Sequence, residues 1–336
     1  MNKSPGQPRL RARCLVSTVT GLIACSLILV RGRVDARGLA FDFTWPWRAA
    51  RIMMLGHNPY AVIQATGVYP FSDRLRYPLP AAVAAMPFAP LNPWHAGAVF
   101  AGVGIVLFTF VITREGWFRL PLLFSGPIFL AVWLCQWSPL LSAAALLPVL
   151  GGLLIAKPTL GLALFAYRPR LSVVLGAIVL SAIAFYFVPD WPVDFLQVAH
   201  GSGGSAYVPP IAQLWLGPVL LLAALRWDSP EGRLLLIMAF VPQSMALYDQ
   251  VPLLLLPRSF RQVCVFTLCS QLAFIGAWLS FQTQHGAVGF SVVSAPWVMA
   301  GCYLPALILV LCRPSRQPAW FERRLSRLLT RFACSR

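Results

Sequence analysis

Two charged residues stand inside long hydrophobic stretches of the sequence. Lys157 directly precedes Pro158, and Asp249 follows Tyr248 in a stretch that also contains Pro242 and Pro252. A charge in an apolar environment is costly, so a residue of this kind is a functional candidate by default. The alternative is that the two residues form an ion pair with each other, or cap a helix at a membrane face.

Asp42 is a candidate general base. It directly precedes a segment, 44–55, that has the residues of a short helix, and the positive end of a helix dipole favours an ionised carboxylate. Such a carboxylate can accept a proton from a hydroxyl group. A capping or solvated aspartate is the alternative interpretation.

The sequence Arg74-Leu-Arg-Tyr-Pro78 leads into the next apolar stretch. The guanidinium groups of Arg74 and Arg76, with Tyr77 beside them, suit a phosphate group, although ordinary anchors at a membrane interface have the same composition. Tyr60 and Tyr248 are further candidates for contacts with a sugar or a phosphate.

The sequence favours neither a metal site nor a cofactor. The four histidines are far apart, and Asp190 and Asp194 lie in a proline-containing loop. The eight cysteines form no CxxC pair, so we interpret them as small residues of apolar segments: Cys14, Cys25, Cys135, Cys264, Cys269, Cys302, Cys312 and Cys334. No glycine loop that would hold a phosphate is present either.

The segments that position these residues have the amino-acid composition of a membrane protein. Of the 336 residues, 58% are hydrophobic and 11% are charged, and the mean hydropathy is +0.72, which excludes an ordinary soluble domain. The net charge of +17 comes from arginines in short clusters between apolar runs. This pattern indicates contact with anionic lipid headgroups and no binding of nucleic acid.

The apolar runs predict an all-α, polytopic protein with about ten to twelve membrane segments in a single domain, 1–336. The runs are 14–30, 79–91, 94–113, 119–134, 138–167, 171–188, 210–225, 234–257, 262–281 and 293–312. Two of them, 138–167 and 234–257, are too long for one span and contain the prolines beside Lys157 and Asp249. We predict that both are helix pairs or broken helices.

With twelve segments, the positive-inside rule places both termini and the basic tail 313–336 in the cytoplasm. Lys157 and the Tyr248-Asp249 turn then belong to the outer side, as do the loops 31–77 and 189–209. In this assignment the short turn from Arg114 to Arg119 also falls outside, as an exception to the rule.

The first outer loop, 31–77, contains the predicted helix. Thr44 is the expected N-cap, Pro46 fits the first turn, and Gly56 followed by Asn58-Pro59 should end the helix. One face is apolar, so we expect the helix to lie flat at the outer membrane interface; the face consists of Trp47, Ala50, Met53 and Met54.

Several phrases occur in an order that resembles glycosyltransferase family 87. They are Asp42-Phe43, Ala49-Ala50, Leu55-Gly-His-Asn-Pro-Tyr60, Tyr77-Pro-Leu-Pro80, Pro87 to Pro90, Gln136, Lys157-Pro-Thr-Leu160 and Tyr248-Asp-Gln-Val-Pro-Leu253. This family is a branch of the GT-C transferases, which use a sugar attached to a polyprenyl phosphate. The resemblance covers about residues 38 to 257, and the chain departs from the family pattern at Trp47, Leu79 and Cys135.

The resemblance implies a multi-pass enzyme of the cell membrane with its active site on the extracytoplasmic face. Such an enzyme transfers a hexose, often mannose, from a polyprenyl phosphate donor to an acceptor glycan or glycolipid, with inversion. By position, Asp42 would be the base, and Arg76, Lys157 and Arg74 would hold the phosphate. Asp249, Tyr77 and Tyr60 would complete the substrate-binding set.

Two other functions remain open. A transporter or lipid flippase would place Lys157 and Asp249 near the bilayer centre, in reach of both faces. A non-catalytic assembly subunit would not bring the candidate residues together. A transferase should gather Asp42, Arg76, Lys157 and Asp249 in one cavity that opens outward.

Overall fold

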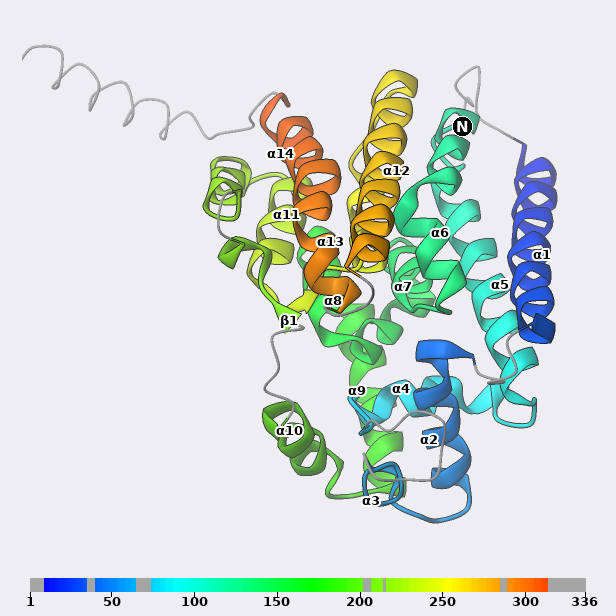
Figure 1. Ribbon diagram of the computed structural model, residues 1–336. Helices are drawn as coiled ribbons and strands as arrows, with labels where there is room; N and C mark the ends of the chain where they lie inside the picture. Colours follow the sequence, from blue (N-terminus) through cyan, green and yellow to red (C-terminus); the bar gives the residue numbers. More distant parts are fainter. Residues whose placement is uncertain are drawn as a thin grey trace, which may run out of the picture.

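The computed structural model describes residues 9–34, 40–64, 74–201, 207–213, 216–284 and 289–313, and these are nearly all helical (Figure 1). This confirms the predicted all-α class. A two-residue antiparallel pair joins β1 (Tyr207–Val208) to β2 (Gln243–Ser244). The tail beyond Arg313, together with Asp35 and His285, lies outside the described residues, so the predicted position of the C-terminus stays a prediction.

The α-helices are α1 (Leu10–Val34), α2 (Thr44–Met54), α3 (Pro59–Val62), α4 (Leu79–Ala85), α5 (Pro93–Ile112), α6 (Gly126–Trp133), α7 (Ser138–Ala144), α8 (Pro158–Tyr167), α9 (Leu171–Phe187), α10 (Trp191–Gly201), α11 (Pro230–Phe240), α12 (Phe260–Thr283), α13 (Phe290–Val298) and α14 (Leu304–Leu311). Between them lie short 3₁₀ segments: η1 (Phe41–Phe43), η2 (Met86–Phe88), η3 (Trp117–Phe124), η4 (Pro148–Ala156), η5 (Pro210–Ala212), η6 (Pro218–Arg226) and η7 (Tyr248–Leu255). A π-helical turn, η8 (Met299–Tyr303), joins α13 to α14.

Four helices in the described part of the chain are long and apolar enough to cross a membrane: α1, α5, α12 and the continuous helix Phe290–Leu311. Two bent pairs bring the number to six at most; α6 and α7 meet at 113°, and α9 and α10 at 98°. These helices are consistent with a multi-pass membrane protein. They are fewer than the predicted ten to twelve segments, because prolines and 3₁₀ turns divide several apolar runs into pieces shorter than a span.

Both overlong runs are broken, as predicted. The run 138–167 consists of α7, η4 and α8, and its second break falls at Lys157. The run 234–257 consists of α11, β2 and η7, and its break contains the loop that leads to Asp249. Each interruption therefore brings a charged residue to the end of an apolar helical segment.

Arginines from distant segments meet at one end of the bundle. Glu231 forms ion pairs with Arg258 and with Arg313, whose Nη1 lies 2.8 Å from the Glu231 carboxylate. Arg226 donates a hydrogen bond of 3.0 Å to the carbonyl of Leu311. The start of α12 and the end of α14 lie at this end, at the top of Figure 1. The positive-inside rule predicts the cytoplasmic side for a basic end of this kind, and this sidedness stays a prediction.

The prediction that the turn from Arg114 to Arg119 lies on the side opposite Arg258 is wrong. Arg119 donates a 2.7 Å hydrogen bond to the carbonyl of Pro257, one residue before Arg258, so the turn lies at the basic end. The cause is α4: its seven residues cover about 10 Å, whereas the hydrocarbon core is about 30 Å thick. The helix within the run 79–91 is therefore too short for a span, and α5 carries the chain to the basic end.

The helix α2 lies at the opposite end, with α3, α4 and α10 (Figure 1). Its predicted apolar face packs against protein and not against lipid, because Trp47 is buried and donates from Nε1 to the carbonyls of Phe88 and Leu91, each at 3.1 Å. Met54, expected on this face, is 53% exposed.

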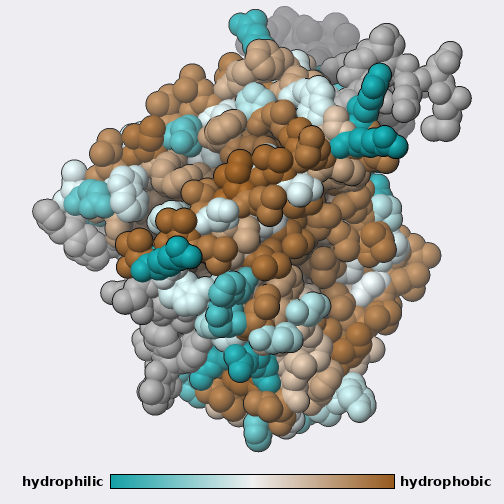
Figure 2. Space-filling view, turned by 90° about the vertical axis from the view of Figure 1, so that its right-hand side faces the viewer, coloured by the Kyte–Doolittle hydropathy of each residue, from teal (hydrophilic) through white to brown (hydrophobic). Residues whose placement is uncertain are grey.

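A broad apolar area crosses the molecular face seen in Figure 2, with hydrophilic side chains mainly above and below it.

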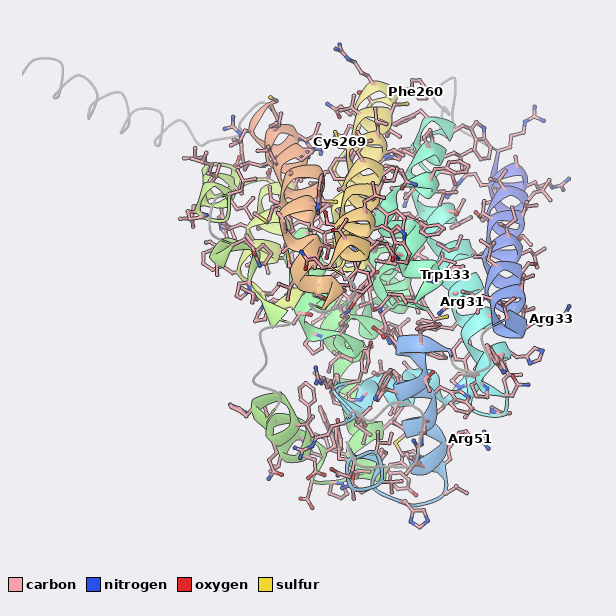
Figure 3. All side chains as sticks on the ribbon, in the orientation of Figure 1. Arg31, Arg33, Arg51, Trp133, Phe260 and Cys269 are labelled. Atoms are coloured by element: carbon pink, nitrogen blue, oxygen red, sulfur yellow. The ribbon has the colours of Figure 1, made fainter. Side chains whose placement is uncertain are left out.

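Cysteine labelling tests this sidedness. In a variant without native cysteines, we expect Glu115→Cys to react with an impermeant maleimide from the same side as Arg261→Cys, and Arg51→Cys to react from the other side. Arg51 and the start of α12 lie at opposite ends of the molecule (Figure 3). Labelling of Glu115→Cys and Arg51→Cys from the same side would contradict the path of α4 and α5.

Candidate functional site

A cavity of about 490 Å³ lies where the segments opposite the basic end meet the broken helices. Six of the seven predicted site residues line it: Asp42, Arg74, Arg76, Tyr77, Lys157 and Asp249. They come from four separate parts of the chain, so the fold brings together the residues that the sequence singled out.

Asp42 lies in η1, directly before α2, and is half-buried. One of its carboxylate oxygens accepts a hydrogen bond from Nε2 of Gln136, and its backbone N–H donates to the carbonyl of Leu134 at 3.3 Å. Two segments nearly a hundred residues apart thus hold this carboxylate at the cavity wall.

The predicted N-cap of α2 is wrong. Thr44 is the first residue of α2, the N-cap position is Phe43, and no side chain caps the helix. The turn η1 precedes α2 without an extended residue between them, so a side-chain cap has no place in the backbone. The predicted end is confirmed, since Gly56 has a φ of +80° and the Asn58 side chain caps α3.

Buried aromatic side chains pack together next to Asp42 and Gln136. Phe43 is fully buried, and its ring stacks on that of Phe100 with a centroid distance of 3.8 Å. The Trp137 ring lies against the Phe100 ring at 4.9 Å. Because Phe43 and Trp137 are the neighbours of Asp42 and Gln136, this cluster fixes the depth of both polar side chains.

In the described part of the chain, three residues other than glycine have a positive φ, and each lies within two residues of a polar side chain of the site. Phe41 (+44°) directly precedes Asp42, Cys135 (+48°) directly precedes Gln136, and Leu247 (+54°) lies two residues before Asp249. A conformation of this kind costs on the order of 1–3 kcal/mol and persists only where the surrounding packing enforces it. The positive-φ residues therefore indicate that packing around the site holds the backbone in an unfavourable conformation, which fixes the positions of the neighbouring side chains.

Lys157 and Asp249 form an ion pair, with Nζ 2.5 Å from Oδ1. Asp249 is completely buried, and its Oδ2 accepts a hydrogen bond of 3.1 Å from the backbone N–H of Ser244. The side chain of Lys157 is 15% exposed, and its Nζ lies 5.1 Å from the centre of the Tyr248 ring. The ammonium group has three N–H donors, so it can keep this pair and still present a donor to the cavity.

Tyr60 is the predicted site residue that does not line the cavity. It is buried, and its hydroxyl donates a 2.8 Å hydrogen bond to the carbonyl of Tyr77. Burial raises the pKa of Tyr60 above its usual value, so this phenol stays protonated and remains a donor. Tyr60 therefore supports the segment that carries Arg76 and Tyr77, and does not itself reach the cavity.

The cavity has further lining residues that the sequence did not identify: Trp45, Thr159, Phe195, Ala199 and Gln243. Two of these, Phe195 and Ala199, belong to α10, a segment predicted to be part of the loop 189–209. A 2.8 Å hydrogen bond from Asn58 to Asp194 ties α10 to the start of α3. The position of Gln136 was visible only through the family resemblance, and no sequence signal pointed to α10.

The charges of the wall favour an anionic ligand. Three cationic side chains and two carboxylates line the cavity, and one of the carboxylates, Asp249, is already paired with Lys157. Within the described residues, no three His, Cys, Asp or Glu side chains are grouped closely enough to hold a metal ion. Chemically, the arginines and the lysine of such a cavity can hold an anion, and a carboxylate such as that of Asp42 can accept a proton.

Comparisons of the chain with protein-family models, with curated proteins and with solved structures gave no match.

A glycine substitution tests how tightly the two site segments are held. A Cβ at Gly97 in α5 would lie 2.6 Å from Cβ of Ala40 and 3.3 Å from Sγ of Cys135, whereas at Gly104 in the same helix the nearest atom is 3.7 Å away. We expect Gly97→Ala to destabilise the protein by about 1–3 kcal/mol through overpacking. Gly104→Ala should leave stability unchanged or slightly raised.

The measurement is the melting temperature of the purified protein in detergent, with unfolding monitored by tryptophan fluorescence. Equal melting temperatures for Gly97→Ala and Gly104→Ala would show that the segments around Ala40 and Cys135 are not packed as described.

Proposed function

We propose that the protein is an integral membrane glycosyltransferase. It moves a hexose, mannose or a similar sugar, from a polyprenyl phosphate donor to an acceptor glycan or glycolipid at the outer face, with inversion. The observation that carries the proposal is the meeting of Asp42 with Arg74, Arg76 and Lys157 in one cavity. The resemblance of the same residues to glycosyltransferase family 87 supports it.

In this proposal Asp42 is the general base. The acceptor hydroxyl oxygen attacks the anomeric carbon and forms the new C–O bond, while Asp42 takes the hydroxyl proton. The bond between the anomeric carbon and the phosphate oxygen breaks on the opposite side, and its electron pair leaves with the lipid phosphate. The amide of Gln136 orients the carboxylate for this transfer.

The cations of the cavity stabilise the negative charge that develops on the leaving phosphate. Arg74 and Arg76 are exposed at the cavity, where they can meet a ligand from the membrane interface. Lys157 is held in place by the buried Asp249, so it does not have to reorganise during the reaction. Asp249 is then a positioning residue, and Tyr77 is a further contact for the substrate.

A transporter or flippase is the second candidate, because the ion pair of Lys157 and Asp249 lies at the breaks of two apolar helical segments. That function needs no base, whereas the cavity also contains a half-buried Asp42 with an amide that orients it. The two candidate functions therefore predict different effects on activity when the Asp42 carboxylate is removed.

The test is transfer of radiolabelled hexose from a panel of polyprenyl-phosphate hexoses by the purified protein. We expect Asp42→Asn to lower transfer by about 10²–10⁴-fold, the usual contribution of general base catalysis. Asp190→Asn is the matched control, because Asp190 is exposed and does not line the cavity, and it should keep the activity of the unaltered protein.

Transfer at an unchanged rate in Asp42→Asn would remove Asp42 as the base. Movement of the lipid-linked sugar between the leaflets of a liposome, without transfer and with no effect of Asp42→Asn, would favour the transporter.

A further inference from the structure

Arg31 lies in the last turn of α1 and does not line the cavity. Its guanidinium carbon lies 3.3 Å from the centre of the Phe41 ring and 4.5 Å from that of the Trp133 ring. Its Nη1 also donates a hydrogen bond to the carbonyl oxygen of Trp133. In Figure 3 Arg31 lies toward Trp133, whereas Arg33, two residues further on, points away from the molecule.

We infer that Arg31 is a positioning residue that clamps together the two segments carrying Asp42 and Gln136. Arg31 contacts one segment through Phe41, the residue before Asp42. The other is reached through Trp133, three residues before Gln136. The inference rests on the proposed function for its catalytic consequence, and on the contacts of Arg31 for its structural content.

Each clamped segment contains a strained residue next to its polar side chain. Phe41 has a φ of +44° and Cys135 a φ of +48°. Conformations of this kind relax unless contacts on both sides oppose them. Arg31 supplies such contacts to the Phe41 ring and to Trp133, at the start of the turn that ends at Gln136. A backbone hydrogen bond from Asp42 to Leu134 joins the residues that directly follow Phe41 and Trp133.

The clamp requires an arginine. A planar guanidinium can stack on aromatic rings and donate in its own plane to a carbonyl at the same time. A lysine ammonium keeps the charge but has no plane to stack and no fixed fork of donors. The cation also lies near the carboxyl end of α1, where a positive charge is favourable. Lysine at this position should therefore keep the electrostatic contribution and lose the clamp.

The experiment compares Arg31→Gln and Arg31→Lys with Arg33→Gln as the matched control, since Arg33 is exposed in the same helical turn. The first measurement is hydrogen–deuterium exchange in nanodiscs. We expect faster exchange of peptides covering 40–44 and 133–137 in both Arg31 variants, and no change in Arg33→Gln. This readout needs no substrate.

The second measurement is the kinetics of hexose transfer. We expect kcat to fall about 100-fold in Arg31→Gln, the cost of a small misplacement of reacting groups, with the KM for the donor within about twofold of the unaltered protein. Arg31→Lys should not restore kcat. In the Asp42→Asn background, Arg31→Gln should lower transfer no further, because a residue that acts through Asp42 has nothing left to position.

The outcomes separate the inference from the proposed function. Active protein whose kcat is unchanged in Arg31→Gln, or whose KM rises while kcat stays constant, would overturn the positioning role and leave the transferase standing. Unchanged exchange at 40–44 and 133–137 would overturn the clamp. If the unaltered protein transfers no hexose from any donor, the function fails, and the exchange data alone decide whether Arg31 joins the two segments.

Discussion

The ion pair between Lys157 and Asp249 is the interaction on which the cavity depends. Both charges come from points where long apolar runs are interrupted, and a charge in such a place persists only when it is paired. The broken backbone lines a cavity, which is where membrane proteins tolerate irregular structure. Removal of either partner would leave a buried charge alone, so the pair fixes the relative depth of α8 and η7.

The two carboxylates of the cavity are in different environments. Asp249 is fully buried and accepts from the backbone of Ser244, while Asp42 is half-buried and is oriented by Gln136. A carboxylate locked into an ion pair is suited to hold a cation in place. A partly exposed one is suited to accept a proton from a ligand. This difference in environment assigns the two residues different roles in the proposed reaction.

The sequence predicted the helical class and the breaks at Lys157 and Asp249, because charge in an apolar run is a strong signal. It singled out Asp42, Arg74 and Arg76 by residue type and by their places before helical segments, and the fold brings them into one cavity. It did not predict the number of long helices, since hydropathy counts apolar residues and not the 3₁₀ turns that divide them. The path through α4 was missed for the same reason, and with it the side on which Arg119 lies. Gln136 was singled out only through the family resemblance, whereas the positions of Arg31 and α10 depend on tertiary contacts between distant segments, which no local pattern contains.

The most direct test of the account is an experimental structure of the protein in nanodiscs with a bound polyprenyl-phosphate hexose. We expect density for the phosphate between Arg76 and Lys157, with the anomeric carbon of the sugar facing Asp42. Phosphate density elsewhere, or Asp42 separated from Lys157 so that no common cavity exists, would contradict it.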